Sequence, residues 1–286
     1  MTPNGAEEFV AVPLQECEFE KLRRLVHERF GIVLPTEKRT MVAVRLQKVL
    51  RRMHLRSFRQ YYEYLVQSHD YQALIEFANA ITINHTFFFR EKEHFDMLVR
   101  NVLPEMSVKL KRHYDMDFRV WCAGCSSGEE AYTLSMVMQE FWGSEYVYWQ
   151  AGVLATDISE KVLSIAMQGI YDEERVALVP PEYKAKYFQR LRNGYWQVKP
   201  IVRHDVLFRK FNLMNQHFPF KKPFHVIFCR NVMIYFDKPT RDALVQRFYD
   251  VLTPGGYLFI GHAETIDRSK SAFEYLAPAF YRKPVS

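Results

Sequence analysis

The stretch DFRVWCAGCSSGEEAYTLSM, residues 117–136, decides the fold. It begins with an apolar run typical of a buried strand, passes through a turn that ends at Gly128, and continues as a helix that starts at Glu129. A strand, a glycine turn and a helix N-terminus in this order bring the backbone close to a ligand. We therefore expect a binding crevice at this turn.

Similar apolar runs follow further along the chain and alternate with helical segments. They are YWQAGVLATD (148–157), HVIFCRNVMIYF (225–236) and YLFIGHAE (257–264). This alternation predicts an α/β fold with a mostly parallel sheet, which FEYLAPAFYRK (273–283) closes as an antiparallel strand. The Asn193–Gly194 pair indicates a small β-hairpin, a β-subdomain inserted at about residues 187–206.

The chain before this region reads as short helices. One ends at Gly31, a second follows Pro35–Thr36, and a third starts at Ser57, which is a capping residue type. We therefore divide the chain into a helical N-terminal domain, a structured connector and the α/β domain, at residues 1–73, 74–92 and 93–286.

Composition limits the class of protein. The 286 residues are 48% hydrophobic and carry a formal charge of +6, which argues against a disordered chain. The sequence has neither an apolar run of the roughly 18 residues that span a bilayer nor a secretory leader pattern, so we expect a cytoplasmic protein. Its four cysteines fit a reducing compartment. The Cys122/Cys125 pair lacks a second cysteine pair or clustered histidines, so we predict neither a disulfide nor a metal site.

The positive charge is concentrated in residues 38–59, which hold eight Lys and Arg and no acid. Five of these cations recur at helical steps of three and four and predict a basic stripe on one helix, namely Arg45, Lys48, Arg52, Arg56 and Arg59. A break in this helix near Ser57 is the alternative. Such a stripe indicates an acidic binding partner, and the candidates are phosphates, an anionic membrane and an acidic protein helix. The apolar side of the helix is short and aliphatic, which makes membrane insertion the least favoured of the three.

Polar residues at the ends of the expected strands suggest the ligand. Glu129 and Glu130 begin a helix where they would repel a phosphate, and they suit a nucleotide-like cofactor with positive charge such as S-adenosylmethionine. The alternative is that they only complement the helix dipole. Asp157 ends the second strand, where an acid accepts hydrogen bonds from a ribose diol. The third strand is followed by three more polar residues, Arg230, Asn231 and Tyr235.

Together the motifs NHTFFFR (84–90), WCAGCSSGEEAY (121–132), ATD (155–157), CRNVMIYFD (229–237) and LTPGGYLFIGH (252–262) resemble the CheR chemoreceptor methyltransferases. The resemblance covers about residues 15–282, in family order. It implies a helical domain joined to a class I, Rossmann-like methyltransferase domain with an inserted β-subdomain. It also implies transfer of a methyl group from S-adenosyl-L-methionine to receptor glutamates, which leaves glutamyl methyl esters and S-adenosyl-L-homocysteine.

The resemblance further implies which residues form the site. The cofactor-binding residues would be Asn84, Thr86, Arg90, Glu129, Asp157, Asn212, Leu213, Arg230 and Asn231. Arg90 would lie near the methionine carboxylate and the reacting centre, and Tyr235 near the transferred methyl, so these two would be the catalytic residues. Glu129 is favoured over Glu130 as the contact with the cofactor, but the choice between them stays open.

The resemblance also names partners. The basic stripe would bind the acidic methylation helices of chemoreceptors. Family members that tether to a receptor's C-terminal pentapeptide have a glycine-rich loop in the β-subdomain, whereas RLRNGYWQVKPIVRH (190–204) has one glycine, which argues against tethering. A nucleic-acid methyltransferase is disfavoured because CRNVMIY replaces the expected Pro-Pro-aromatic motif. A non-catalytic cofactor-binding module is disfavoured by the presence of Arg90 and Tyr235.

Overall fold

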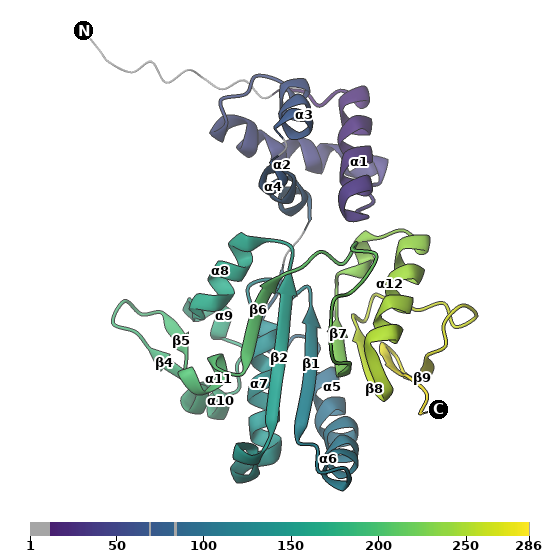
Figure 1. Cartoon of the computed structure of the whole chain (residues 1–286). Helices are drawn as coiled ribbons and strands as arrows, with labels where there is room; N and C mark the ends of the chain where they lie inside the picture. Colours follow the sequence, from purple (N-terminus) through teal and green to yellow (C-terminus); the bar gives the residue numbers. More distant parts are fainter. Residues whose placement is uncertain (1–11, 69, 83–84, 286) are drawn as a thin grey trace. The chain divides into compact units, whose positions relative to one another are not determined.

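A computed structural model describes residues 12–68, 70–82 and 85–285 of the chain. The chain divides into two compact units, Met1–Asn84 and His85–Ser286. Figure 1 shows the first unit as helices and the second as a sheet flanked by helices. Within the described residues, no helix combines the length and the apolarity that crossing a membrane requires.

Short helices build the first unit. They are α1 (Glu16–Phe30), η1 (Thr36–Lys38), α2 (Arg39–Arg52), α3 (Phe58–Gln67) and α4 (Tyr71–Ile81). As expected, α1 ends at Gly31, which has a left-handed backbone (φ 68°), and the Ser57 side chain caps α3 by accepting from the Gln60 N–H. Apolar side chains from all four α-helices are buried between them.

The basic residues do not all lie on one helix, because the break near Ser57 that the sequence left open is present. Helix α2 ends at Arg52, and the chain turns through His54 (φ 53°) before α3 begins. Arg45, Lys48 and Arg52 therefore lie on α2, whereas Arg56 lies in the turn and Arg59 on α3. The capping of α3 by Ser57 stops the continuous helix that the spacing alone suggests.

The boundary between the units also differs from the sequence division at residue 73. Helix α4 packs against α1 and α2, with Leu74, Phe77 and Ile81 buried and the Phe77 ring edge-on to Tyr61 at 6.0 Å. The expected connector, residues 74–92, is thereby split: its first half completes the helical unit, and the part from His85 onward belongs to the second unit.

The second unit is built on a seven-stranded sheet of order β6-β2-β1-β7-β8-β10-β9. The strands are β1 (Asp117–Ala123), β2 (Gln150–Asp157), β6 (Val206–Lys210), β7 (Phe224–Cys229), β8 (Leu252–Ile260), β9 (Glu274–Ala277) and β10 (Phe280–Arg282). The pairs β2–β6, β1–β2, β1–β7 and β7–β8 are parallel, and β10 pairs antiparallel with both β8 and β9. The expected closing strand is thus two strands, and β6 is a parallel edge strand that we did not predict.

Alternating side chains of the strands fill two cores, one on each face of the sheet. Val120 and Cys122 of β1 pack on one side under helices α5 (Lys92–Met97), η2 (Leu98–Val102), α6 (Leu103–Arg112), α7 (Glu129–Trp142) and α8 (Glu160–Gln168). Trp121 and Ala123 pack on the other side under α12 (Lys238–Val251). Cys122 is therefore an ordinary buried thiol, and burial raises its pKa well above the usual value.

A second, three-stranded sheet lies beside α9 and α10, at the left of Figure 1. It consists of β3 (Ile170–Tyr171), β5 (Trp196–Val198) and β4 (Phe188–Arg190), with α9 (Glu173–Val176), α10 (Pro181–Tyr187) and α11 (Pro200–Arg203) around it. The Asn193–Gly194 turn joins β4 to β5, and Gly194 has the positive φ (84°) that such turns require. The short helices η3 (Gly143–Tyr148) and η4 (Met233–Tyr235) complete the unit.

Candidate functional site

The glycine turn after β1 is fixed by its own backbone and by the next strand. The N–H groups of Gly124 and Cys125 both donate to the Thr156 carbonyl, each at 2.8 Å. Gly124 (φ 84°) and Gly128 (φ 98°) have left-handed backbones, and a Cβ on Gly124 would stand 2.5 Å from Val232 Cγ2. The turn therefore requires glycine at these two positions and brings bare backbone to the carboxyl edge of the sheet.

Asp157 stands beside this turn at the end of β2. Its Oδ2 accepts from the Ser126 N–H and its Oδ1 from the Ser159 N–H, each at 2.9 Å. Burial outweighs these hydrogen bonds and raises the pKa of Asp157. Each oxygen keeps a second lone pair, so the carboxylate can accept further hydrogen bonds.

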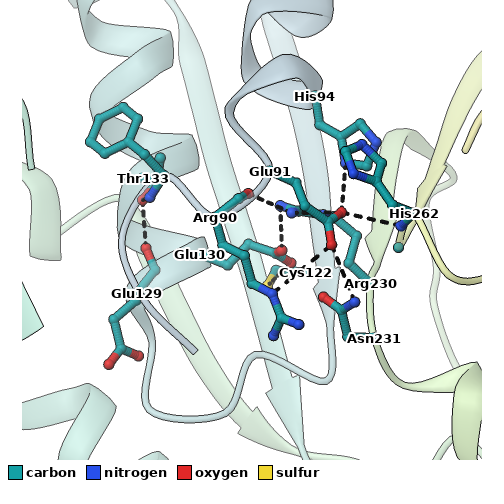
Figure 2. A network of polar contacts seen from close by, with 12 residues as sticks. Arg90, Glu91, His94, Cys122, Glu129, Glu130, Thr133, Arg230, Asn231 and His262 are labelled. Atoms are coloured by element: carbon teal, nitrogen blue, oxygen red, sulfur yellow. Dashed lines mark hydrogen bonds and ion pairs between the residues drawn. The ribbon is translucent and has the colours of Figure 1, made fainter. Parts of the chain in front are cut away.

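The two glutamates at the start of α7 point in different directions (Figure 2). Glu129 is fully buried and turns away from Arg230 (Figure 2), toward Ser127 and Arg175. Glu130 turns into the cluster, where its Oε2 lies 2.9 Å from Arg230 Nη1 and its Oε1 accepts from the Cys122 thiol at 3.2 Å. The structure thus brings Glu130, the alternative that the sequence left open, next to the predicted residue Arg230.

Arg230, directly after β7, is the centre of this cluster. Its side chain is 1% exposed and lies between two carboxylates, with Nη1 on Glu130 and Nη2 3.1 Å from Glu91 Oε2. Nη2 also donates to the Arg90 carbonyl at 2.5 Å, and the guanidinium lies over the Phe95 ring. A buried cation of this kind is tolerated because charged partners surround it.

The Glu91 carboxylate contacts residues from other segments of the chain. Besides Arg230, it accepts from the Asn231 side-chain amide and from the His262 N–H, each at 3.3 Å. Although burial opposes ionisation, the charge of Arg230 and these hydrogen bonds lower the pKa of Glu91. Its backbone is left-handed (φ 54°), which turns the carboxylate back into the cluster next to Arg90.

His94 lies behind Glu91 and is completely buried. Neither ring nitrogen has a hydrogen-bond partner, and burial together with the Arg230 charge lowers its pKa to about 3. Glu91, His94 and His262 hold potential metal-ligand atoms within 4.8 Å of one another. The guanidinium of Arg230 already neutralises the shared carboxylate, so the charge balance there disfavours an added divalent cation.

Asn231 is held in a strained backbone conformation (φ 59°) by Glu264. Glu264 is buried, and its carboxylate accepts from the N–H groups of Asn231 (3.0 Å), Ile234 (3.1 Å) and Gly261 (2.5 Å). A Cβ on Gly261 would stand 2.6 Å from the Asn231 amide nitrogen, so β8 approaches this turn as closely as glycine allows. Tyr235 follows in η4 and is half-buried.

The remaining predicted residues are more scattered. Arg90 is 30% exposed and donates to the His85 carbonyl. Thr86 is half-buried in the same segment, whereas Asn84 lies outside the described residues. Asn212 and Leu213 follow β6, at the carboxyl edge beyond β2; the Asn212 side chain accepts from the Met214 N–H, and Leu213 is buried.

Most predicted substrate-binding cations have partners in their own unit. Arg45 donates to the Thr82 carbonyl at 3.0 Å, Arg52 pairs with Glu76 at 2.5 Å, and Arg59 pairs with Glu63 at 2.9 Å. Lys48 and Arg56 are exposed. The basic surface formed by these five cations is therefore partly neutralised. Lys48 and Arg56 contribute most of its remaining positive charge.

Sequence reasoning missed Glu91, Glu264 and Arg175. Glu264 follows the end of β8 and so carries the signal used elsewhere, a polar residue at the carboxyl edge. Glu91 follows no strand and lies next to Arg90 just before α5, so the only signal for it is that neighbour. Arg175 carries no such signal, because it belongs to the short helix α9 beside the small sheet.

These residues fit a zwitterionic, nucleotide-like molecule. The glycine turn leaves room only for backbone, Asp157 offers lone pairs beside it, and Arg90 and Glu130 present opposite charges within one cluster. S-Adenosylmethionine carries the ribose, carboxylate and ammonium groups that such a donor set matches.

Comparison with known proteins gives the family. Residues 84–280 match the model described as "CheR methyltransferase, SAM binding domain", and residues 18–82 match "CheR methyltransferase, all-alpha domain". The chain is 42% identical over 283 residues to the chemotaxis protein methyltransferase of Borreliella burgdorferi, covering 99% of this chain and 100% of the relative. It is 34% identical over 271 residues to that of Escherichia coli, covering 94% and 91%.

The all-alpha match falls in the helical first unit, and the SAM-binding match covers most of the second unit, which contains the sheet. The predicted fold class and cofactor are confirmed: a helical domain is followed by a methyltransferase domain that binds S-adenosylmethionine. The chain belongs to the CheR methyltransferase family.

Proposed function

We propose that this protein methylates glutamate side chains on the cytoplasmic helices of chemoreceptors. The products would be a glutamyl methyl ester and S-adenosylhomocysteine. Two of the relatives that the chain resembles are chemotaxis protein methyltransferases. The proposal goes further than their names, because it specifies the amino acid that accepts the methyl group.

The state of the acids at the crevice carries the proposal. The carboxylates there already accept hydrogen bonds from neighbouring groups or pair with a cation; they belong to Glu91, Glu130, Asp157 and Glu264. His94 is buried, and its pKa of about 3 makes it a very weak base. A crevice of this kind favours an acceptor that needs no deprotonation, and a glutamate with a pKa of about 4.3 is already ionised at neutral pH.

The chain's own residues would then bind and align the reactants. We assign the cofactor's ammonium group to Glu130, its ribose to Asp157 and its carboxylate to Arg90, while Asn212 and Leu213 border the adenine. Thr86 and Asn84 precede Arg90 in the same segment. Glu91 and Glu130 hold Arg230, and Glu91 and Glu264 hold Asn231, so these two would shape the crevice wall.

When bound, S-adenosylmethionine supplies an electrophilic methyl group next to a positive sulfonium. An approaching glutamate carboxylate neutralises this charge, so a crevice with little water favours the reaction and alignment supplies much of the acceleration. Arg90, which is partly exposed, is better placed to steer the substrate carboxylate than Arg230, which is buried and pairs with Glu91 and Glu130.

Transfer to a receptor fragment tests the function. With methyl-labelled S-adenosylmethionine, we expect label on a chemoreceptor cytoplasmic fragment, released as methanol by mild alkali because esters hydrolyse and methylamines do not. The matched control is the same fragment with its methylation-helix glutamates replaced by glutamine. Alkali-stable label, or equal label on the glutamine fragment, would contradict the proposal.

Tyr235 is the second proposed catalytic residue. Because η4 is held by Glu264 through the Ile234 N–H, Tyr235→Phe should leave the backbone in place and remove only the hydroxyl. We expect kcat to fall about tenfold or more while the Kd for S-adenosylhomocysteine changes less than about twofold. Equal losses in kcat and in cofactor affinity would show that Tyr235 supports binding rather than the transfer.

The basic surface of the helical unit is the proposed receptor contact. We expect Lys48→Gln with Arg56→Gln to raise the KM for the receptor about fivefold at low salt, with a smaller effect at high salt because ions screen the attraction. The matched control removes two exposed cations from the other unit, Arg112→Gln with Lys161→Gln. The same KM in both double variants would rule out this contact.

We propose further that the enzyme recognises the receptor body rather than its tail. The β4–β5 turn is tight: the Leu191 N–H donates to the Tyr195 carbonyl and the Gly194 N–H to the Leu191 carbonyl. In the transfer experiment, receptor fragments with and without the C-terminal pentapeptide should therefore be labelled at the same rate. A measurable submicromolar affinity for the pentapeptide would contradict this.

A further inference from the structure

A second polar group lies on the far side of the glycine turn from Arg230. Arg175 Nη2 donates to the Ser127 hydroxyl oxygen at 3.1 Å, and Nη1 lies 3.4 Å from Glu129 Oε1. The Ser127 hydroxyl lies 2.8 Å from Glu129 Oε2. Glu129 has no exposed surface, and burial, only partly offset by Arg175, raises its pKa. A buried carboxylate at the start of α7 therefore depends on one cation from elsewhere in the chain.

That cation belongs to the segment that carries the small sheet. Arg175 lies on α9, one turn after β3, and Asp172 caps this helix by accepting from the Arg175 N–H. Its neighbour Glu173 accepts from Lys184 of α10 at 2.5 Å and from the Trp196 ring N–H of β5 at 2.6 Å. Polar contacts thus tie the β4–β5 hairpin to Glu173 of α9, and Arg175 of the same short helix to the glycine turn.

Tyr171 of β3 adds a second contact to the same turn. Its hydroxyl donates to the Ser127 carbonyl at 2.7 Å, and a Cβ on Gly128 would stand 3.2 Å from that hydroxyl. Asp157 fixes the turn from the other side through the Ser126 N–H. The backbone that would face the cofactor is therefore clamped between β2 and the small sheet.

We propose that Arg175 is a positioning residue: by neutralising Glu129 and holding Ser127, it keeps the glycine turn in the shape that binds the cofactor, and it links the small sheet to cofactor affinity. This rests on the proposed placement of the cofactor at the turn. Arg175 itself is not a catalytic residue, because it acts through Glu129 and Ser127.

Charge gives this role a measurable signature. The Glu129 carboxylate is buried and the Arg175 side chain is 35% exposed, so removing Arg175 leaves a buried charge without its cation, whereas removing both charges is much less costly. Without Arg175, the closed turn holds a buried Glu129 whose pKa is raised further. The turn then keeps its shape best when Glu129 is protonated at low pH, and loses it as the pH rises. The other groups that face Glu129 are Asp172, Tyr171 and Cys125; burial holds the pKa of the last two well above the usual value, so they stay neutral.

The test is calorimetric titration of the full chain with S-adenosylhomocysteine at about pH 6 and about pH 8.5, each variant compared with wild type at the same pH. We expect Arg175→Met to raise Kd about tenfold at the higher pH and to recover to within about threefold at the lower. The double variant Arg175→Met with Glu129→Gln should bind within about threefold of wild type at both values. Arg175→Lys, which keeps the charge, should lie between.

The outcomes separate this inference from the function on which it rests. If wild type binds S-adenosylhomocysteine but Arg175→Met matches it at both pH values, the positioning role is overturned and the cofactor assignment stands. A loss that is the same at both pH values and is not rescued by Glu129→Gln would mean plain structural damage and would also overturn it. Failure of the wild-type protein to bind would instead overturn the placement of the cofactor.

Discussion

The arrangement of the crevice depends on one buried guanidinium, that of Arg230, which is shared by Glu91 and Glu130. The three residues come from the segment before α5, the end of β7 and the start of α7. The interaction therefore joins parts of the chain that neighbour one another only after the sheet has formed. Because an unpaired buried charge costs several kcal/mol, each of these segments constrains the position of the other two.

The parts of the site that depend on local sequence could be predicted. The glycine turn and Asp157 each follow a parallel strand, so both were expected at the carboxyl edge of the sheet, and Asp157 accepts a hydrogen bond from Ser126 of this turn. The choice between Glu129 and Glu130 could not be made in this way. Consecutive helical residues project about 100° apart, so the two side chains point in different directions. Glu129 pairs with Arg175 and Glu130 with Arg230, and both arginines lie far away in the sequence.

The same limit explains the errors in the fold. Periodicity favoured one helix for five cations and left a break near Ser57 open; the Ser57 cap makes that break, and Glu76 and Glu63 neutralise two of the five. The structure places the boundary between the units after Asn84 rather than after residue 73. The sequence pattern shows that α4 is apolar enough to be buried, but it does not show that α4 packs against α2 of the helical unit. Strand β6 is short and half-exposed, so its pattern was too weak to recognise.

The central claim is that the glycine turn, Asp157 and the Arg230 cluster together form the cofactor site. Calorimetric titration with S-adenosylhomocysteine tests it most directly, on wild type, Asp157→Ala and the exposed-acid control Glu145→Ala. The account predicts that wild type and Glu145→Ala bind alike, and that Asp157→Ala loses about tenfold or more in affinity because a charged hydrogen-bond acceptor is gone. Equal affinity in all three proteins would contradict it.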